Sequence, residues 1–149
     1  MNPSFSHLNA EGQASMVNVG AKPVRRRRAV AAGRLVCQPS TIRALEDRAL
    51  PKGDVLAVAR IAGIQGAKRA SDLIPLCHPL ALDHVEIAFR VQRAAVEIRC
   101  STEISARTGV EMEALAGVSA AALTLYDMCK AVDKTMRIEA IHLVQKVKA

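Results

Sequence analysis

Two charged side chains in the last third of the chain have the types and spacing needed for proton transfer. Asp127 and Lys130 stand three residues apart in a segment with helical periodicity, so they share one helix face. On a solvent-exposed face such a pair would be an ordinary ion pair of small value. Residues 126–132 are otherwise nearly all apolar, and we therefore expect a partly desolvated site in which each group tunes the other for proton transfer.

His78 is a second candidate for acid–base chemistry. It lies between Pro75 and Pro79, which stop a helix and stiffen the backbone, so the sequence predicts a rigid loop that fixes the imidazole. A functional imidazole is one interpretation, and a hydrogen-bonded structural histidine is the other. Adjacent Cys77 suggests a metal pair, but no second cluster follows at ligand spacing, and we predict no metal site.

Two carboxylates begin the longest helical segment. Glu111 and Glu113 point about 200° apart on a helix, so they do not share a proton. A capping box with Thr108 explains Glu111 and leaves Glu113 as a candidate functional group. Fourteen residues separate Glu113 from Asp127, which is about 21 Å of helix. One small molecule can hardly touch both within one chain, so a shared site would need a second subunit, brought in by antiparallel packing of the helices.

The positive charge of the chain is local. The net charge is +7, from 21 basic and 14 acidic residues, and residues 12–45 hold seven basic side chains and no acidic one. Such a surplus indicates an anionic partner. Lys52 precedes a helix N-terminus at Asp54, whose free amides attract phosphate, and Lys68 lies near the other end of that helix. For any single lysine the alternative is a solvated basic face.

Length and composition bound the class of protein. The 149 residues are one domain's length, and we expect a single catalytic domain over 1–149, in which residues 1–20 form an extended arm. The longest uncharged apolar run, residues 114–126, is too short to span a membrane, and the first twenty residues are too polar for a signal peptide. We therefore expect a soluble, cytoplasmic protein. Four widely spaced cysteines favour buried thiols over a zinc ribbon or a disulfide framework.

Hydrophobic periodicity predicts the elements that must position these groups. Strands are expected over 24–37, with an interruption near Gly33, over 85–91 and 96–100 as a hairpin, and over 138–147. Helices are expected from a cap in Pro39–Thr41 to about residue 49, from an Asp54 cap to about 70, and from 110 to about 134. This order predicts an α+β fold, a ferredoxin-like split βαβ sandwich with an antiparallel sheet and helices packed on one face.

Several motifs in this order closely resemble the cyclic pyranopterin monophosphate synthase (MoaC) family of molybdenum cofactor biosynthesis. They are Lys52-Gly-Asp-Val, Ala59-Arg-Ile-Ala-Gly-Ile-Gln, Asp72-Leu-Ile-Pro-Leu-Cys-His-Pro-Leu, Thr108-Gly-Val-Glu-Met-Glu-Ala-Leu and Tyr126-Asp-Met-Cys-Lys-Ala-Val, with His7-Leu-Asn and Met16-Val in the arm. The resemblance covers nearly the whole chain. The sequence departs from the family at Asn18, Gly20 and Arg25, where Asp, Ser and Thr are usual.

The resemblance implies an activity and a set of roles. A GTP derivative already cyclised between ribose and C8, 3',8-cyclo-7,8-dihydro-GTP, would be rearranged to cyclic pyranopterin monophosphate with loss of pyrophosphate, in a hexamer built as a trimer of dimers. It implies no redox cofactor and leaves open whether Mg²⁺ accompanies the triphosphate. By motif position Asp127 and Lys130 would be the acid–base pair. The other implied site residues, which would line the substrate site or engage phosphates and catalytic groups, are Leu76, Cys77, His78, Met112, Glu113, Lys52, Lys68 and Arg27.

The main alternative is an RNA-binding ferredoxin-like module. Arg25 to Arg28 form a basic run, and sheets of this fold can bind RNA. Such sheets stack bases on strand aromatics, and the predicted strands offer only Phe89. We therefore rank RNA binding below the enzyme and expect no nucleic-acid partner.

Overall fold

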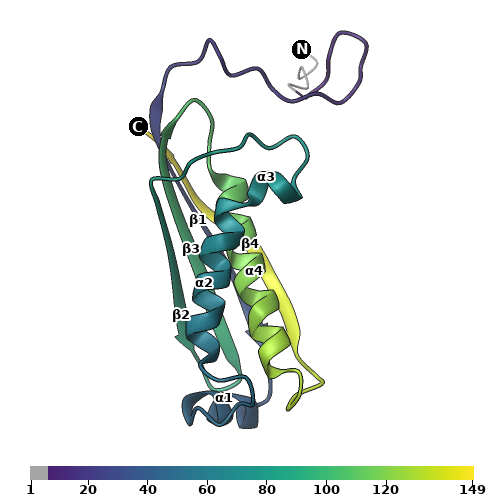
Figure 1. Cartoon of the computed structure of the whole chain (residues 1–149), viewed down its shortest axis with the longest axis vertical. Coiled ribbons are helices and arrows are strands. Elements are labelled where there is room, and N and C mark those ends of the chain that lie inside the picture. The colour runs from purple at the N-terminus through teal and green to yellow at the C-terminus, as the bar shows by residue number, and fades with distance from the viewer. Residues whose placement is uncertain (1–6) are drawn as a thin grey trace.

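A computed structural model, which describes residues 7–149, shows one antiparallel four-stranded sheet with helices on one face (Figure 1). The strand order is β2-β3-β1-β4. In chain order the elements are β1 (Arg25–Val36), α1 (Pro39–Glu46), α2 (Val55–Lys68), α3 (Ala70–Leu73), β2 (His84–Val91), β3 (Ala95–Ala106), α4 (Glu111–Cys129) and β4 (Arg137–Lys148). The predicted ferredoxin-like α+β sandwich is confirmed.

The strands form where alternating apolar residues predict them. β2 and β3 pair as a hairpin, with Val91 opposite Val96, and β1 lies between β3 and β4. The predicted interruption near Gly33 is confirmed, because the β1–β4 register shifts between Ala32 and Arg34. A Cβ on Gly33 would lie 2.8 Å from a methyl carbon of Val118 in α4. The missing side chain therefore lets α4 pack directly on the middle of the sheet.

Small residues bring α2 and α4 together as the single helical layer. A Cβ on Gly66 would lie 2.5 Å from the Ala120 Cβ, and one on Gly63 would lie 3.1 Å from the carbonyl oxygen of Gly117. The two helices run antiparallel, so the start of α2 lies beside the end of α4 (Figure 1). The core beneath them consists mainly of Ala, Val, Leu and Ile, as the composition predicts.

Two predicted helix starts are wrong. α1 begins at Pro39, a residue suited to the first helical position because it lacks an amide hydrogen, and Gln38 is its N-cap. The Thr41 hydroxyl donates to Asp133 Oδ2 at 2.8 Å and caps nothing. α4 begins at Glu111 without a side-chain cap from Thr108, and Glu111 forms an ion pair with Lys146 of β4 rather than a capping box.

Helix ends also differ from the prediction, whereas the Asp54 cap is confirmed. Asp54 Oδ1 accepts from the Ala57 amide at 3.1 Å. α2 ends at Lys68 and is followed by the short α3, and α4 ends at Cys129 instead of near residue 134. Within residues 7–149 no helix is long and apolar enough to cross a membrane.

The described part of the arm is not extended throughout. Residues 1–6, which belong to the predicted arm, lie outside the described residues. Asn9 Oδ1 accepts from the amides of Glu11 and Gln13, which closes a turn that brings Leu8 beside Ala14. The chain then runs extended through residues 15–19 and returns to the sheet at Arg25.

Candidate active site

The predicted site residues gather at opposite ends of the α2–α4 pair. One group surrounds a cavity of about 360 Å³ that lies between the arm, the loop 74–79 and the first turn of α4; we call it the arm cavity. Five predicted residues line it, namely Leu76, Cys77, His78, Met112 and Glu113. The structure therefore brings together groups from two motifs that lie more than thirty positions apart in the sequence.

Glu113 is the buried carboxylate of the arm cavity. Its residue is only 3% exposed, and burial raises its pKa above the ordinary range. The Cys77 thiol lies 3.6 Å from Glu113 Oε1 and donates to it. Burial first, and the neighbouring Glu113 charge second, raise the pKa of Cys77 to about 11. Cys77 is therefore a protonated hydrogen-bond donor at neutral pH rather than a nucleophilic thiolate.

His78 is held in the arm cavity by the arm. Its Nε2 lies 2.7 Å from the carbonyl oxygen of Val17, and the ring is half-buried. Sequence reasoning missed this contact, and it also missed Val19 and Lys22, which line the same cavity. The sequence offered one short signal, since Val17 and Val19 alternate with the polar Asn18, a pattern that marks a side of the arm that packs against something.

The second group is the lysine–aspartate cluster of Lys52, Asp127 and Lys130. Asp127 accepts from Lys52 Nζ at 2.7 Å through Oδ2, and its Oδ1 lies 2.6 Å from Lys130 Nζ. The bond from Lys130, followed by that from Lys52, lowers the pKa of Asp127 to about 2. The same contact with Asp127 raises the pKa of Lys130.

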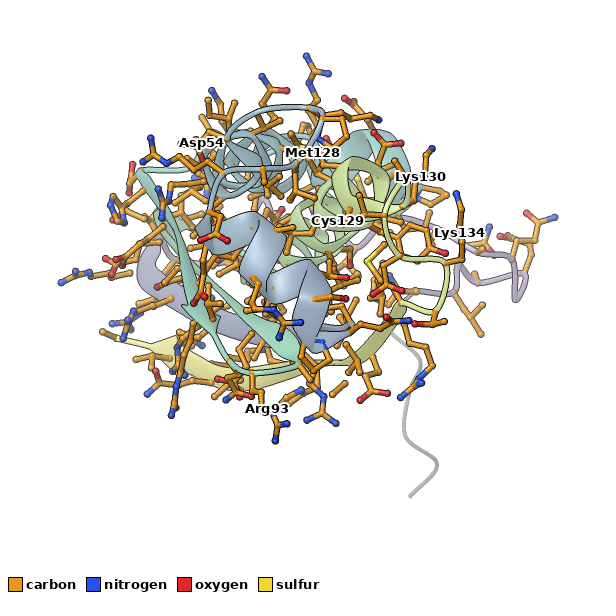
Figure 2. The ribbon with its side chains drawn as sticks, turned by 90° about the horizontal axis from the view of Figure 1, so that it is seen from below. Asp54, Arg93, Met128, Cys129, Lys130 and Lys134 are labelled. Carbon is orange, nitrogen blue, oxygen red and sulfur yellow. The ribbon has the colours of Figure 1, made fainter. Side chains whose placement is uncertain are left out.

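The expected desolvation of Asp127 and Lys130 is wrong for a single chain. Their side chains are 54% and 53% exposed. Met128 and Cys129, the apolar neighbours in sequence, are buried in the core, so they do not cover the pair. Figure 2 shows Lys130 and Lys134 directed away from the body of the protein at this end of α4.

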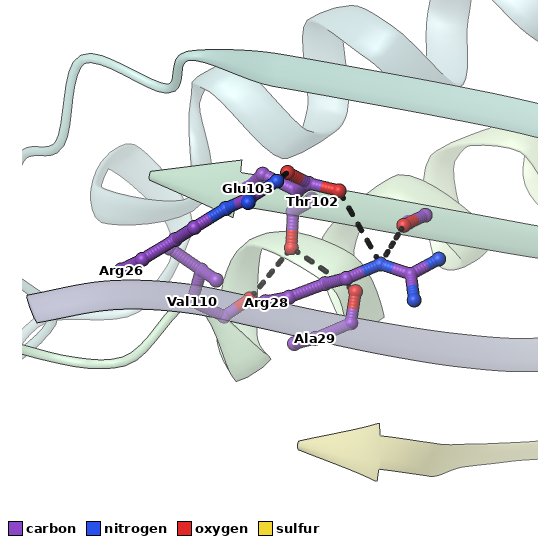
Figure 3. Close-up of polar contacts among 7 residues, drawn as sticks. Arg26, Arg28, Ala29, Thr102, Glu103 and Val110 are labelled. Carbon is purple, nitrogen blue, oxygen red and sulfur yellow. Dashed lines mark hydrogen bonds and ion pairs between the residues drawn. The ribbon is translucent and has the colours of Figure 1, made fainter. Parts of the chain in front are cut away.

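The basic stretch divides between the two faces of the sheet. Arg26 and Arg28 both reach Glu103, at 2.8 and 3.4 Å, on the face opposite the helices (Figure 3). Arg27 lies on the helix-facing side of β1 beside Ile104, and its Nε is a buried donor without a hydrogen-bond partner among the described residues. The structure thus places Arg27 on the opposite face of the sheet from Arg26 and Arg28.

Lys68 lies at the arm-cavity end of the helix pair. It is exposed in the last turn of α2, two residues beyond Gly66, which packs against Ala116 near the start of α4. Neither Lys68 nor Arg27 lines the arm cavity itself. A larger hollow of about 550 Å³ lies across the strands, but it contains none of the predicted site residues.

The structure gives no support to the RNA-binding alternative. Phe89 lies opposite Ile98, a core residue, and Arg60 of α2 stands over its ring at 5.6 Å. The ring therefore faces the helical layer, where it cannot stack a base on the open face of the sheet.

Glu113 and Asp127 lie near opposite ends of α4, as the spacing predicts, so one chain presents two separate sets of polar groups. One set is a half-buried cavity with a carboxyl, a thiol and an imidazole, and the other is a carboxylate clamped between two ammonium groups. A ferredoxin-like α+β sandwich that carries two separate clusters of ionisable side chains is the class that fold and site define.

Comparison with known proteins identifies the family. The sequence pattern of the MoaC family matches residues 16–149. A "Cyclic pyranopterin monophosphate synthase" from Chloroflexus aurantiacus is 57% identical over 95% of this chain and 88% of its own, and one from Desulfatibacillum aliphaticivorans is 51% identical over 95% and 91%. A "Molybdenum cofactor biosynthesis bifunctional protein" from Chlorobaculum tepidum is 54% identical over 95% of this chain and 46% of its own. This chain belongs to the MoaC family.

Proposed function

We propose that this chain is a cyclic pyranopterin monophosphate synthase that converts 3',8-cyclo-7,8-dihydro-GTP to cyclic pyranopterin monophosphate and pyrophosphate in the cytoplasm. Family membership supports the activity. The observation that carries the proposal to particular residues is the Asp127 carboxylate bound by two lysines. A clamped carboxylate stays ionised while it holds two proton donors in place, which suits a rearrangement that opens and recloses a ring.

The lysine–aspartate cluster would perform the proton transfers. Lys130 Nζ is the proposed acid–base group, Asp127 fixes its position, and Lys52 neutralises the carboxylate from the other side. Pyrophosphate departs with developing negative charge, which the cations Arg27 and Lys68 would stabilise. The reaction is redox-neutral and asks no redox cofactor of the chain, and Mg²⁺ would enter only with the triphosphate.

The arm cavity would bind the ring system of the substrate. It is lined by the buried Glu113, whose pKa is raised by burial. Its carboxyl oxygens can accept a hydrogen bond from a ring amide of the substrate. Leu76 and Met112 supply apolar surface beside it, and His78 supplies an imidazole.

Both sets of groups can act on one substrate only if chains associate, and we propose a homo-oligomer, a hexamer built as a trimer of dimers. Within one helix about 21 Å separates Glu113 from Asp127. The exposed apolar side chains Val58, Ile61 and Leu123 lie on α2 and α4, so the helical layer has an apolar outer surface that a second copy could cover. Antiparallel contact would also bring the exposed lysine–aspartate cluster of one chain toward the arm cavity of its partner.

The decisive experiment measures conversion of the cyclised GTP derivative by purified protein, with pyrophosphate and product quantified together. Asp127→Asn and Lys130→Ala should lose at least about a hundredfold in turnover, the scale of a lost general acid–base group. Lys134→Ala is the matched control, because it removes an exposed lysine from the same end of α4 and should leave turnover unchanged. Near-wild-type rates in Asp127→Asn and Lys130→Ala, with intact oligomers, would contradict the assignment.

A further inference from the structure

The contact between the arm and His78 determines which ring nitrogen carries hydrogen. His78 Nε2 lies 2.7 Å from the carbonyl oxygen of Val17. A carbonyl oxygen can only accept, so the bond forms only when Nε2 is the protonated nitrogen. The neutral ring must then carry its lone pair on Nδ1. The described residues place no hydrogen-bond partner on Nδ1, and His78 lines the arm cavity, so this lone pair is left for a ligand.

Two apolar side chains anchor the arm in the place where it makes this contact. Val17 and Val19 are half-buried and line the cavity, whereas Met16 between Ser15 and Val17 is 52% exposed. The alternation shows that the extended stretch 15–19 lies along the cavity with one side inward. The arm is therefore a wall of the cavity as well as the partner of the imidazole.

We propose that the arm is a positioning element of the site: the Val17 carbonyl locks His78 in the Nε2–H tautomer and presents Nδ1 as an acceptor to a protonated ring nitrogen or hydroxyl of the substrate. The part that concerns substrate rests on the proposed function, whereas the contact between Val17 and His78 is independent of it. A docked arm gives one tautomer, and an undocked arm gives a mixture of two. Docking of the arm thereby determines whether Nδ1 is the nitrogen that can accept a hydrogen bond inside the cavity.

The first test uses full-length protein labelled with ¹⁵N-histidine and long-range ¹H–¹⁵N spectra, which report the tautomer of each ring. The His78 signals are assigned by their loss in His78→Gln. We expect the Nε2–H pattern in the wild type and tautomer averaging in Val17→Gly/Val19→Gly, which removes both apolar anchors. Ala14→Gly/Met16→Gly is the matched control, because it adds the same number of glycines at exposed arm positions and should keep the wild-type pattern.

Docking of the arm is followed in parallel by cleavage after Glu11 with a glutamate-specific protease. Val17→Gly/Val19→Gly should be cut about tenfold faster than wild type, the factor that the burial of two half-buried valines supports. His78→Gln keeps a donor near the Nε2 position and should retain protection, whereas His78→Asn keeps polarity only near Nδ1 and should lose it. Unchanged His84 and His142 signals show that each variant is folded.

Three results would overturn the proposal. They are a wild-type ring with hydrogen on Nδ1, a pure Nε2–H ring in Val17→Gly/Val19→Gly while its arm is cut faster, and equal cleavage rates in that variant and the wild type. None of these measurements needs substrate, so failure of the arm contact and failure of the proposed activity are separate results. Where conversion is also measured, Val17→Gly/Val19→Gly should lose turnover and the Ala14→Gly/Met16→Gly control should not.

Discussion

Asp133→Asn should both destabilise the protein and change how its stability responds to acid. Asp133 is 2% exposed and joins the segment after α4 to the start of α1. Its Oδ2 accepts from the Gln38 amide at 2.9 Å and the Thr41 hydroxyl at 2.8 Å, and its Oδ1 accepts from the Thr135 amide at 2.8 Å and hydroxyl at 2.7 Å. Burial acts to raise the pKa of this carboxyl, but the four hydrogen bonds outweigh it and hold the pKa at about 2.

The size of the effect follows from that pKa. The pKa falls from its ordinary value of 3.8 to about 2 on folding, which at roughly 1.4 kcal/mol per pH unit contributes about 2 kcal/mol to the free energy of unfolding. Because the folded pKa is the lower one, this contribution is present above about pH 4 and is lost as the pH falls through about 2. Asp133→Asn removes this titrating group. The free energy of unfolding should therefore fall by about 2 kcal/mol at pH 7 and change little near pH 2.

The assay is urea unfolding followed by circular dichroism at several pH values, at one protein concentration. Asp127 also has a lowered pKa, but it is present in both proteins and cancels in the difference. Thr41→Val is the control, because it removes one of the four bonds and keeps the charge; it should cost about 1 kcal/mol and preserve most of the acid dependence. A constant difference between wild type and Asp133→Asn from pH 7 to pH 2 would refute the reasoning.

Two further predictions concern the helix contact and the thiol of the arm cavity. Gly66→Val should lower the free energy of unfolding by about 1–3 kcal/mol, since even a Cβ would lie 2.5 Å from the Ala120 Cβ. Ala62→Val in the same helix is the control for added volume alone. Equal losses of unfolding free energy in the two variants, measured in urea, would contradict the contact. Glu113→Gln should speed alkylation of Cys77 at pH 8 several-fold, because the Cys77 pKa of about 11 is raised first by burial and second by the Glu113 charge. The buried Cys37, Cys100 and Cys129 are the internal reference. An unchanged rate of alkylation would show that burial alone raises the pKa of Cys77.

Local physical rules predicted most of the elements correctly. Alternation in residues 85–91 and 96–100 predicts the hairpin because side chains of a strand point alternately to two faces, and only one face of this sheet is covered. Asp54 predicts its helix start because the carboxylate can reach the amides of the first turn. The predictions at Thr41 and Thr108 failed because each position has a competing arrangement that the sequence nearby does not reveal: Thr41 bonds to Asp133, 92 residues later, and Glu111 pairs with Lys146.

The candidate site likewise combines features that follow from local sequence with contacts between residues far apart in the chain. The fold class, the separation of Glu113 from Asp127 and the pairing of Asp127 with Lys130 could be predicted from the sequence, because periodicity and helix geometry act over a few turns. Three features became visible only in the folded chain: Lys52 completes the clamp on Asp127, Arg27 faces away from Arg26 and Arg28, and the Val17 carbonyl contacts His78. Two of these contacts join residues 61 and 75 positions apart, and the facing of Arg27 depends on the register of β1. Long-range contacts and strand register follow from how the helices and the sheet pack, not from local propensity.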